Sequence, residues 1–183
     1  MILRELTPNH PDIPAVKKLF EEAFPENERT VNMDVILANL KQMPIKLLGI
    51  YPEETPDTFA GFFLTFEGES SAYLTYLAIC PEQRSGGIGG KAMSAIREYY
   101  KGKTLMFSYE SPFEESDNAE QREKRRKFHL RNGFYETGWF AKMNGTEFIL
   151  ACSKEDFDKE EFLSFLSGMI PEGTPIPELY RRD

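Results

Sequence analysis

The chain has 183 residues, of which 40% are hydrophobic and 28% are charged, a length and balance typical of one folded domain with a substantial core. Its formal net charge of −8 argues against non-specific binding to nucleic acid and suits a cationic small molecule better. The chain has only two cysteines and two histidines, which argues against a disulfide framework and against a metal site. It has no long apolar run and no signal-peptide pattern, so we expect a cytoplasmic protein with no membrane partner.

Short apolar runs and amphipathic helices follow one another along the chain. The patterns predict, in order, a strand at 1–6, helices at 13–24 and 33–42, strands at 45–51, 59–66 and 71–79, a helix at 89–100, a strand at 104–109, a helix at 120–132, strands at 135–143 and 146–151, and a helix at 156–167. This order predicts a mixed sheet with helices packed on its faces, not an alternating doubly wound fold. The 71–109 segment is a β-loop-α-β unit, so its two strands should be parallel.

Local signals add detail to this outline. We expect Asp12 to cap the first helix, and the end of the 71–79 strand to be buried on both faces because it lacks polar alternation. Asn144-Gly145 predicts a hairpin turn. We find no domain linker, so residues 1–183 are expected to form a single domain whose Pro-rich tail, 171–183, lies over the surface.

A glycine-rich stretch, Pro81 to Lys91, links the 71–79 strand to the helix that follows. Its four glycines let the backbone approach a ligand closely, although glycine weakens a helix start. The first N–H groups of a helix have no internal partner and carry the positive end of its dipole. A bare helix start followed by Lys91 therefore favours an anion such as phosphate, with an ordinary surface turn as the alternative.

Two nucleotide-binding motifs fit this stretch poorly. A Walker A loop needs a glycine where Ser85 stands, and a serine or threonine at the position of Ala92. The dinucleotide fingerprint matches as Gly87-x-Gly89-x-x-Ala92, but it should open directly from its strand, and Cys80 to Gly86 lie between. Neither motif accounts for the segment as a whole.

The stretch resembles the acetyl-CoA-binding core of the GNAT acetyltransferases. Their signature, Arg/Gln-x-x-Gly-x-Gly/Ala between a strand and a helix, matches Arg84 to Gly89. Downstream, Phe128 to Phe134 lies where that family has Phe/Leu-Tyr-x-x-x-Gly-Phe. The two motifs occur in the family's order and, with the order of elements, the resemblance covers most of the chain.

The resemblance implies an α/β (mixed α+β) fold, a largely antiparallel twisted sheet of about seven strands with helices on both faces and a splayed parallel pair at the acetyl-CoA site. In such a site a strand end hydrogen-bonds pantetheine and can also point an N–H group at the thioester oxygen, while the loop binds the pyrophosphate. The coenzyme-binding residues are then Leu77, Ala78, Ile79, Arg84, Ser85, Gly86, Gly87, Ile88, Gly89, Gly90 and Lys91.

Direct transfer to an amine needs an acid for the departing thiolate and a base for the ammonium proton. The family commonly places a tyrosine as the acid four residues before the glycine of the second motif, and His129 holds that place here. His129 is the candidate acid, as a cation or as a hydrogen-bond donor to sulfur, with Tyr135 and Tyr109 as substitutes. The alternative is a helix histidine that packs beside Phe128.

Carboxylates offer the candidate base. Glu110 follows the 104–109 strand, whose end should lie beside the thioester, and the alternative is a solvated strand-end carboxylate. Glu26 and Glu28, between the first two helices, are candidates for substrate binding or a water chain, against a solvated loop. In the charged helix, Arg125 or Arg126 can meet the coenzyme phosphates, although such a charge run is more often a solvated face.

The sequence therefore predicts an N-acetyltransferase that moves an acetyl group from acetyl-CoA to a primary amine by direct attack in a ternary complex. The amine belongs to a small molecule or a protein, and no metal is needed. A homodimer is possible through the Asn144-Gly145 hairpin and the last helix. The alternative is a non-catalytic CoA-binding or ligand-sensing domain on the same fold.

Overall fold

The computed structural model describes residues 1–24, 29, 31–84, 86–143, 145–169 and 177–182. These residues contain an eight-stranded sheet with the strand order β1-β2-β3-β4-β5-β7-β6-β8. The chain divides into two compact units, and each unit combines two separate segments. Unit 1 comprises Met1–Glu67 and Leu74–Tyr99, and unit 2 comprises Gly68–Tyr73 and Tyr100–Asp183.

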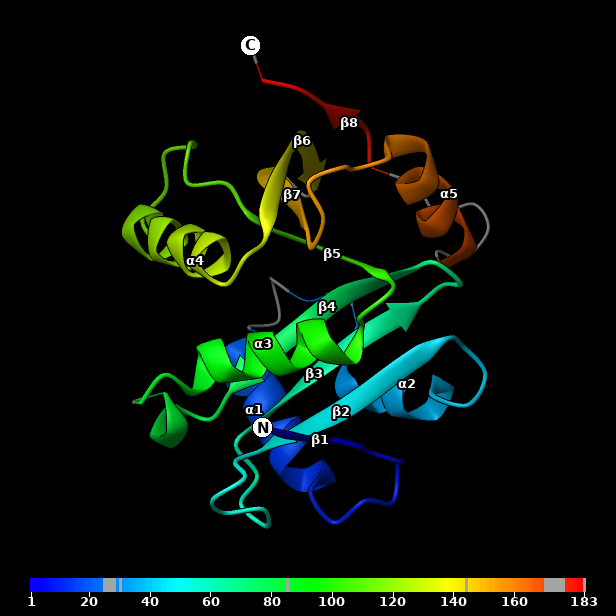
Figure 1. Cartoon of the computed structure of the whole chain (residues 1–183), viewed down its shortest axis with the longest axis vertical. Coiled ribbons are helices and arrows are strands. Elements are labelled where there is room, and N and C mark those ends of the chain that lie inside the picture. The colour runs from blue at the N-terminus through cyan, green and yellow to red at the C-terminus, as the bar shows by residue number, and fades with distance from the viewer. Residues whose placement is uncertain (25–28, 30, 85, 144, 170–176, 183) are drawn as a thin grey trace. The chain divides into compact units, whose positions relative to one another are not determined.

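In unit 1, antiparallel strands carry helices on both faces. Its elements are β1 (Ile2–Glu5), α1 (Ile13–Ala23), α2 (Met33–Asn39), β2 (Ile45–Tyr51), β3 (Gly61–Glu67), most of β4 (Ser71–Ile79), the 3-10 turn η2 (Pro81–Gln83) and α3 (Ile88–Tyr99). β2 pairs antiparallel with both β1 and β3. The helices α1 and α2 lie behind these strands and α3 lies in front of them (Figure 1). This arrangement confirms the predicted mixed fold with helices on both faces.

One face of the unit 1 strands packs against α1 and α2. Leu47, Phe62, Leu64, Tyr76 and Ala78 belong to one apolar cluster with α1 and α2. Buried residues of α3, Ala92, Met93 and Ile96, follow helical spacing. The cluster includes Tyr76 and Ala78 of β4, and so it holds in place the strand that the glycine-rich loop follows.

β4 alternates more than its apolar sequence suggests. Tyr76 and Ala78 are buried, whereas Thr75, Leu77 and Ile79 are partly exposed. The prediction that this strand end is buried on both faces is therefore wrong. Tertiary packing, not hydropathy, decides which of two apolar faces is covered.

The starts of α1 and α2 also differ from expectation. Asp12 has helical dihedral angles and forms no side-chain cap, so the predicted capping is wrong. Its carboxylate instead accepts a hydrogen bond of 2.6 Å from the Tyr51 hydroxyl. Burial is the larger cause, and this bond the smaller one, of a raised pKa of Tyr51. Asn32 is the capping residue of α2, and its side chain accepts from the Val35 N–H at 2.9 Å.

In unit 2, β5 lies between a parallel and an antiparallel neighbour. Its elements are β5 (Thr104–Glu110), α4 (Ala119–Arg131), β6 (Tyr135–Met143), β7 (Thr146–Cys152), α5 (Lys159–Met169) and β8 (Leu179–Tyr180). The start of β4, Ser71–Tyr73, pairs in parallel with β5, which confirms the predicted parallel pair. β5 and β6 both pair antiparallel with β7, and Met143 faces Thr146 across the predicted hairpin.

The last strand, β8, was not predicted. It pairs antiparallel with β6 through Leu179 and Tyr180, and Leu179 joins an apolar cluster with Met106, Leu150 and Phe162. Residues 179 and 180 are thus part of the sheet rather than a surface tail. Two residues carry too weak a local pattern to predict a strand, so the partner strand decides their conformation.

Candidate functional site

The loop that follows β4 in unit 1 folds back onto the end of that strand. The Cys80 N–H donates to the Ala60 carbonyl at 2.9 Å, and η2 follows. The exposed Arg84 side chain then donates from Nε to the Ile79 carbonyl at 3.1 Å. The arginine of the predicted signature therefore fixes the loop on its strand, which leaves the loop backbone to meet a ligand.

Two glycines give the loop its shape. Gly86 and Gly87 have φ angles of 85° and 77°, in the left-handed region that favours glycine. A Cβ built on either residue meets no heavy atom of the described chain within 4 Å, so the space beside both is open. The backbone at these two glycines is therefore accessible, as close approach of an anion requires.

The start of α3 also has features that favour binding of an anion. The Lys91 N–H donates to the Gly87 carbonyl at 3.1 Å, which marks the first bond of the helical ladder. By helix geometry, the N–H groups of Ile88, Gly89 and Gly90 precede that ladder and have no acceptor within it. The side chain of Lys91 is 55% exposed and lies 3.8 Å from Glu54. A backbone site with one nearby cation fits a phosphate or pyrophosphate.

β3 approaches the end of β4 unusually closely at Gly61. A Cβ at this position would lie 2.3 Å from the Ala78 carbonyl oxygen and 3.0 Å from the Ile79 Cα. Only glycine therefore permits the observed path of β4 at the residues predicted to bind pantetheine. The sequence analysis missed Gly61 because the contact joins residues that are distant along the chain.

Three of the predicted residues lie outside the described part of the chain. They are Ser85 in the loop and Glu26 and Glu28 between α1 and α2. Their roles stay predictions. The remaining coenzyme candidates all belong to unit 1 and to the continuous segment from Leu77 to Lys91.

His129 of unit 2 lies in an aromatic cage. Its ring stacks on Tyr109, with centroids 4.9 Å apart, and contacts Phe107 at 4.6 Å. The residue is only 9% exposed, and its Nδ1 has no hydrogen-bond partner in the described part of the chain. Burial, with a smaller effect from Arg125, lowers the pKa of His129 to about 4. The imidazole is therefore neutral at pH 7.

Glu110, the candidate base, is held by two arginines of α4. Its two carboxylate oxygens lie 3.3 Å from Arg122 and 3.2 Å from Arg125, and 14% of its side chain is exposed. Arg122 is itself only 8% exposed and also donates to the Ser111 carbonyl and the Asn118 side chain. The interpretation of this charge run as a solvated face is wrong at Arg122, because this side chain is buried and pairs with Glu110 of β5.

A second acid in unit 2 was not predicted. Glu136 accepts two hydrogen bonds from Arg126, at 2.6 and 3.1 Å, and one from the Tyr109 hydroxyl at 2.6 Å. Burial acts to raise the pKa of Glu136, but the bonds from Arg126 and Tyr109 lower it overall. Burial and Glu136 together raise the pKa of Tyr109, so this substitute acid keeps its proton firmly. Tyr135 is exposed, and among the residues that the structure describes its side chain has no comparable hydrogen bond.

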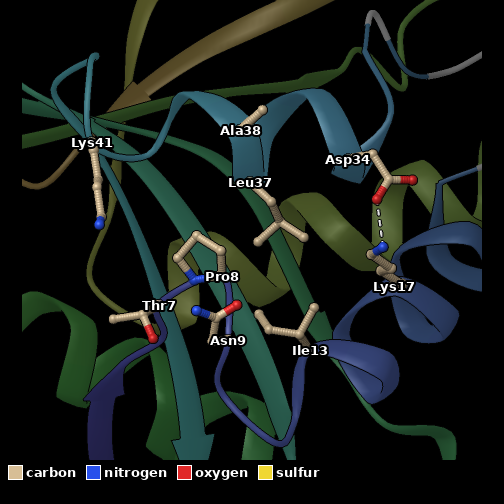
Figure 2. Close-up of a pocket in the computed structure, with 9 residues that line it drawn as sticks. All are labelled: Thr7, Pro8, Asn9, Ile13, Lys17, Asp34, Leu37, Ala38 and Lys41. Atoms are coloured by element: carbon tan, nitrogen blue, oxygen red, sulfur yellow. Dashed lines mark hydrogen bonds and ion pairs between the residues drawn. The ribbon is translucent and has the colours of Figure 1, made fainter.

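One hollow of unit 1 lies away from the glycine-rich loop, between α1, α2 and the segment after β1. It has a volume of about 670 Å³, with Ile13 and Leu37 in its wall (Figure 2). Lys17 and Asp34 form an ion pair at one end, and Lys41 stands at the other. Two lysines against one aspartate suit a cationic amine poorly, so we assign this hollow no part in binding the predicted substrate.

The described residues show neither a membrane helix nor a metal cluster. None of their helices has both the length and the apolar content needed to cross a bilayer. Within the same part of the chain, no three His, Cys, Asp or Glu side chains come together as metal ligands.

Comparisons with known proteins identify the fold. No family model and no curated protein matches the sequence. Solved structures do match. An acetyltransferase assigned to the GNAT family from Bacteroides thetaiotaomicron is 19% identical with a TM-score of 0.71, covering 91% of this chain and 93% of its own. An aminoglycoside 6'-N-acetyltransferase solved with coenzyme A is 15% identical with a TM-score of 0.65, covering 86% and 99%.

A third matching structure contains both the coenzyme and an amine. Spermidine N-acetyltransferase from Vibrio cholerae, in complex with CoA and spermine, is 13% identical with a TM-score of 0.61, covering 82% of this chain and 93% of its own. At these identities the likeness establishes the fold. The chain has the GNAT fold, as the sequence motifs predicted.

Proposed function

We propose that this chain of GNAT fold is an N-acetyltransferase that moves the acetyl group of acetyl-CoA to a primary amine by direct attack in a ternary complex. The observation that carries the proposal is the loop before α3. Gly86 and Gly87 hold left-handed conformations beside open space, at the start of a helix whose first N–H groups have no acceptor within it. This loop is the proposed site for the coenzyme pyrophosphate.

The end of β4 is the proposed partner of pantetheine. Leu77 and Ile79 are partly exposed, and an extended amide chain can pair with a strand through backbone hydrogen bonds. Gly61, which has no Cβ, lets this part of the strand lie close to β3. The same solved structures support a ligand of this kind, because two of them contain CoA.

The chemistry is acyl transfer. The amine nitrogen attacks the thioester carbonyl, the tetrahedral oxyanion collapses, and CoA leaves as a thiolate that must be protonated. His129 and Glu110 remain the proposed acid and base. Because the pKa of His129 is about 4, its imidazole is neutral at pH 7, so it would assist departure as a hydrogen-bond donor to the sulfur, and the thiolate would take its proton from water.

The amine is proposed to be cationic, as the net charge of −8 favours. The spermidine and aminoglycoside enzymes that share this fold have substrates of that class. Glu26 and Glu28 are proposed to bind it. We also propose that the chain forms a single domain, is located in the cytoplasm and assembles as a homodimer. Light scattering tests whether the homodimer forms.

One observation favours the alternative of a CoA-binding domain without catalysis. His129 stands where the family commonly has tyrosine, and its cage of Tyr109 and Phe107 suits a structural residue as well as a catalytic one. The two functions differ in whether bound acetyl-CoA releases its thiol when an amine is added.

The deciding experiment measures CoA thiol release with acetyl-CoA and a panel of polyamines, aminoglycosides, and lysine and N-terminal amines. We expect release that depends on one class of amine, with the acetylated product found by mass spectrometry. Calorimetry with acetyl-CoA accompanies the assay. Tight binding without amine-dependent release would establish the alternative, and absence of binding would reject both functions.

A further inference from the structure

Thr75 of β4 carries a covered hydroxyl without a partner. Its Oγ1 is buried, and within the described residues nothing accepts from it or donates to it. A covered hydroxyl with no hydrogen bond opposes folding, because it has lost its bonds to water. Such an atom persists where a water or a ligand supplies the missing bond.

The strand geometry places Thr75 in line with the proposed pantetheine site. Thr75, Leu77 and Ile79 lie on one face of β4 and are partly exposed, whereas Tyr76 and Ala78 lie on the other and pack against α1 and α2. The row from Thr75 to Ile79 therefore leads toward the loop that begins after the strand.

The length of the coenzyme arm then identifies the position of the reacting end. From its phosphate to its sulfur, pantetheine has about as many backbone bonds as four residues of extended chain, each spanning roughly 3.3–3.6 Å. An arm that starts from the loop at the end of β4, near Ile79, and pairs with the strand has its sulfur four residues earlier. That residue is Thr75.

We propose that the Thr75 hydroxyl donates a hydrogen bond to the carbonyl oxygen of the thioester. This inference rests on the proposed function. As the amine nitrogen forms its bond to the carbonyl carbon, the π electron pair moves to the oxygen, and the bond from Thr75 stabilises the resulting oxyanion. When the C=O bond reforms, the C–S bond breaks and the thiolate takes up a proton, while the ammonium proton passes to a base.

The first test compares Thr75→Val with Thr75→Ser. Valine keeps the shape of threonine but removes the hydroxyl, and serine restores it. We expect kcat to fall about 100-fold in T75V, with the KM for acetyl-CoA raised by no more than about fivefold, and to stay within about threefold of the wild type in T75S. Unchanged turnover in T75V, or no recovery in T75S, would overturn the inference.

A second readout separates this role from a structural one. Since the hydroxyl has no partner among the residues that the structure describes, its removal in T75V is expected to raise the Tm by about 2 °C or more. The matched control is Thr137→Val, because the Thr137 hydroxyl donates to the Leu150 carbonyl at 3.0 Å and its loss should lower the Tm. A lower Tm in T75V would show that the hydroxyl supports the fold, and would overturn the proposal.

A third measurement does not depend on turnover. If Thr75 bonds the thioester oxygen, the wild type should bind acetyl-CoA about fivefold more tightly than CoA, and T75V should lose that preference. Equal binding of the two by the wild type overturns the role of Thr75 even where amine-dependent thiol release is observed. Failure of the proposed function is seen separately, as the absence of that release.

Discussion

The glycine-rich loop of unit 1 and the charged cluster of unit 2 are built in opposite ways. The loop consists of backbone groups beside open space, and its cations, Arg84 and Lys91, are exposed. The cluster consists of side chains, and its carboxylates Glu110 and Glu136 are each bonded to arginine. A ligand anion can meet the first without displacing anything, whereas the second already satisfies its own charges. Binding is therefore expected to depend on backbone shape, and stability on charge pairing.

The largest effect is expected where the loop loses its shape. Gly87→Glu places a negative side chain in the open space and strains a residue with φ of 77°. We expect the affinity for CoA to fall at least 10³-fold, about 4 kcal/mol, in calorimetry.

The control for this prediction is Gly102→Glu. Gly102 also has a left-handed conformation, with φ of 97°, and open space around it, but it lies in the turn after α3. It should show the same backbone strain and bind CoA normally. Retained binding in G87E would mean that the phosphates bind elsewhere.

The next effect concerns pH and tests whether the cage of His129 keeps it neutral. The unfolded imidazole binds a proton near pH 6.5, but the folded one binds it only near pH 4. Stability that is fully present above pH 6.5 should thus be lost as the pH falls to about 4, by about 3 kcal/mol. Denaturant unfolding at a series of pH values measures this loss.

His129→Phe is the matched variant, since phenylalanine fits a cage formed by Phe107 and Tyr109 and does not titrate. This part of the pH dependence should disappear in H129F. The same variant examines catalysis. If H129F folds normally and still releases CoA thiol at the wild-type rate, His129 is structural and the proposed acid is wrong.

A smaller effect is expected from the charge pairs of unit 2. Glu136→Ala leaves Arg126 and the Tyr109 hydroxyl without their shared acceptor, and both are partly buried. We expect the free energy of unfolding to fall by about 2 kcal/mol. Affinity for CoA should stay unchanged, which is the contrast with the loop.

Glu123→Ala serves as the control for Glu136→Ala. Glu123 also pairs with Arg126, but at 3.8 Å and with 35% of its side chain exposed. Its loss should cost less than about 0.5 kcal/mol. A reduction in CoA affinity in E136A, with stability intact, would show that the cluster serves the ligand rather than the fold.

The smallest effect is expected for the side-chain charge beside the loop. Lys91→Ala removes a cation that is 55% exposed, so we expect the affinity for CoA to fall only about threefold and to depend weakly on salt. Titration at two salt concentrations measures both. A 100-fold loss would contradict the view that the backbone carries the binding.

Local pattern was sufficient for most of the fold. The predicted ranges 45–51, 71–79 and 135–143 coincide with β2, β4 and β6, because apolar runs bounded by turn residues carry the strand signal within themselves. The loop motif also depends on local sequence, since glycines before a helix start predict an anion site, and that site stays a prediction. These features depend on neighbours along the chain.

The predictions that were wrong concern features that depend on residues distant along the chain. Asp12 was predicted as a helix cap, but Tyr51, which is distant along the chain, takes its carboxylate. The arginines of α4 were predicted as a solvated face, but Glu110 and Glu136 lie on strands that pack against that helix. β8 forms because it pairs with β6 and because Leu179 packs in an apolar cluster.

The sequence by itself determined the order of the elements, the position of the glycine-rich loop and the resemblance to the GNAT acetyltransferases. Only the tertiary structure decided the surroundings of each polar group: the neutral state of His129, the pairing of Glu110 and the orphan hydroxyl of Thr75. The reason is physical. Conformational preference is a property of short segments, whereas solvation and charge depend on which distant residues come within a few ångströms.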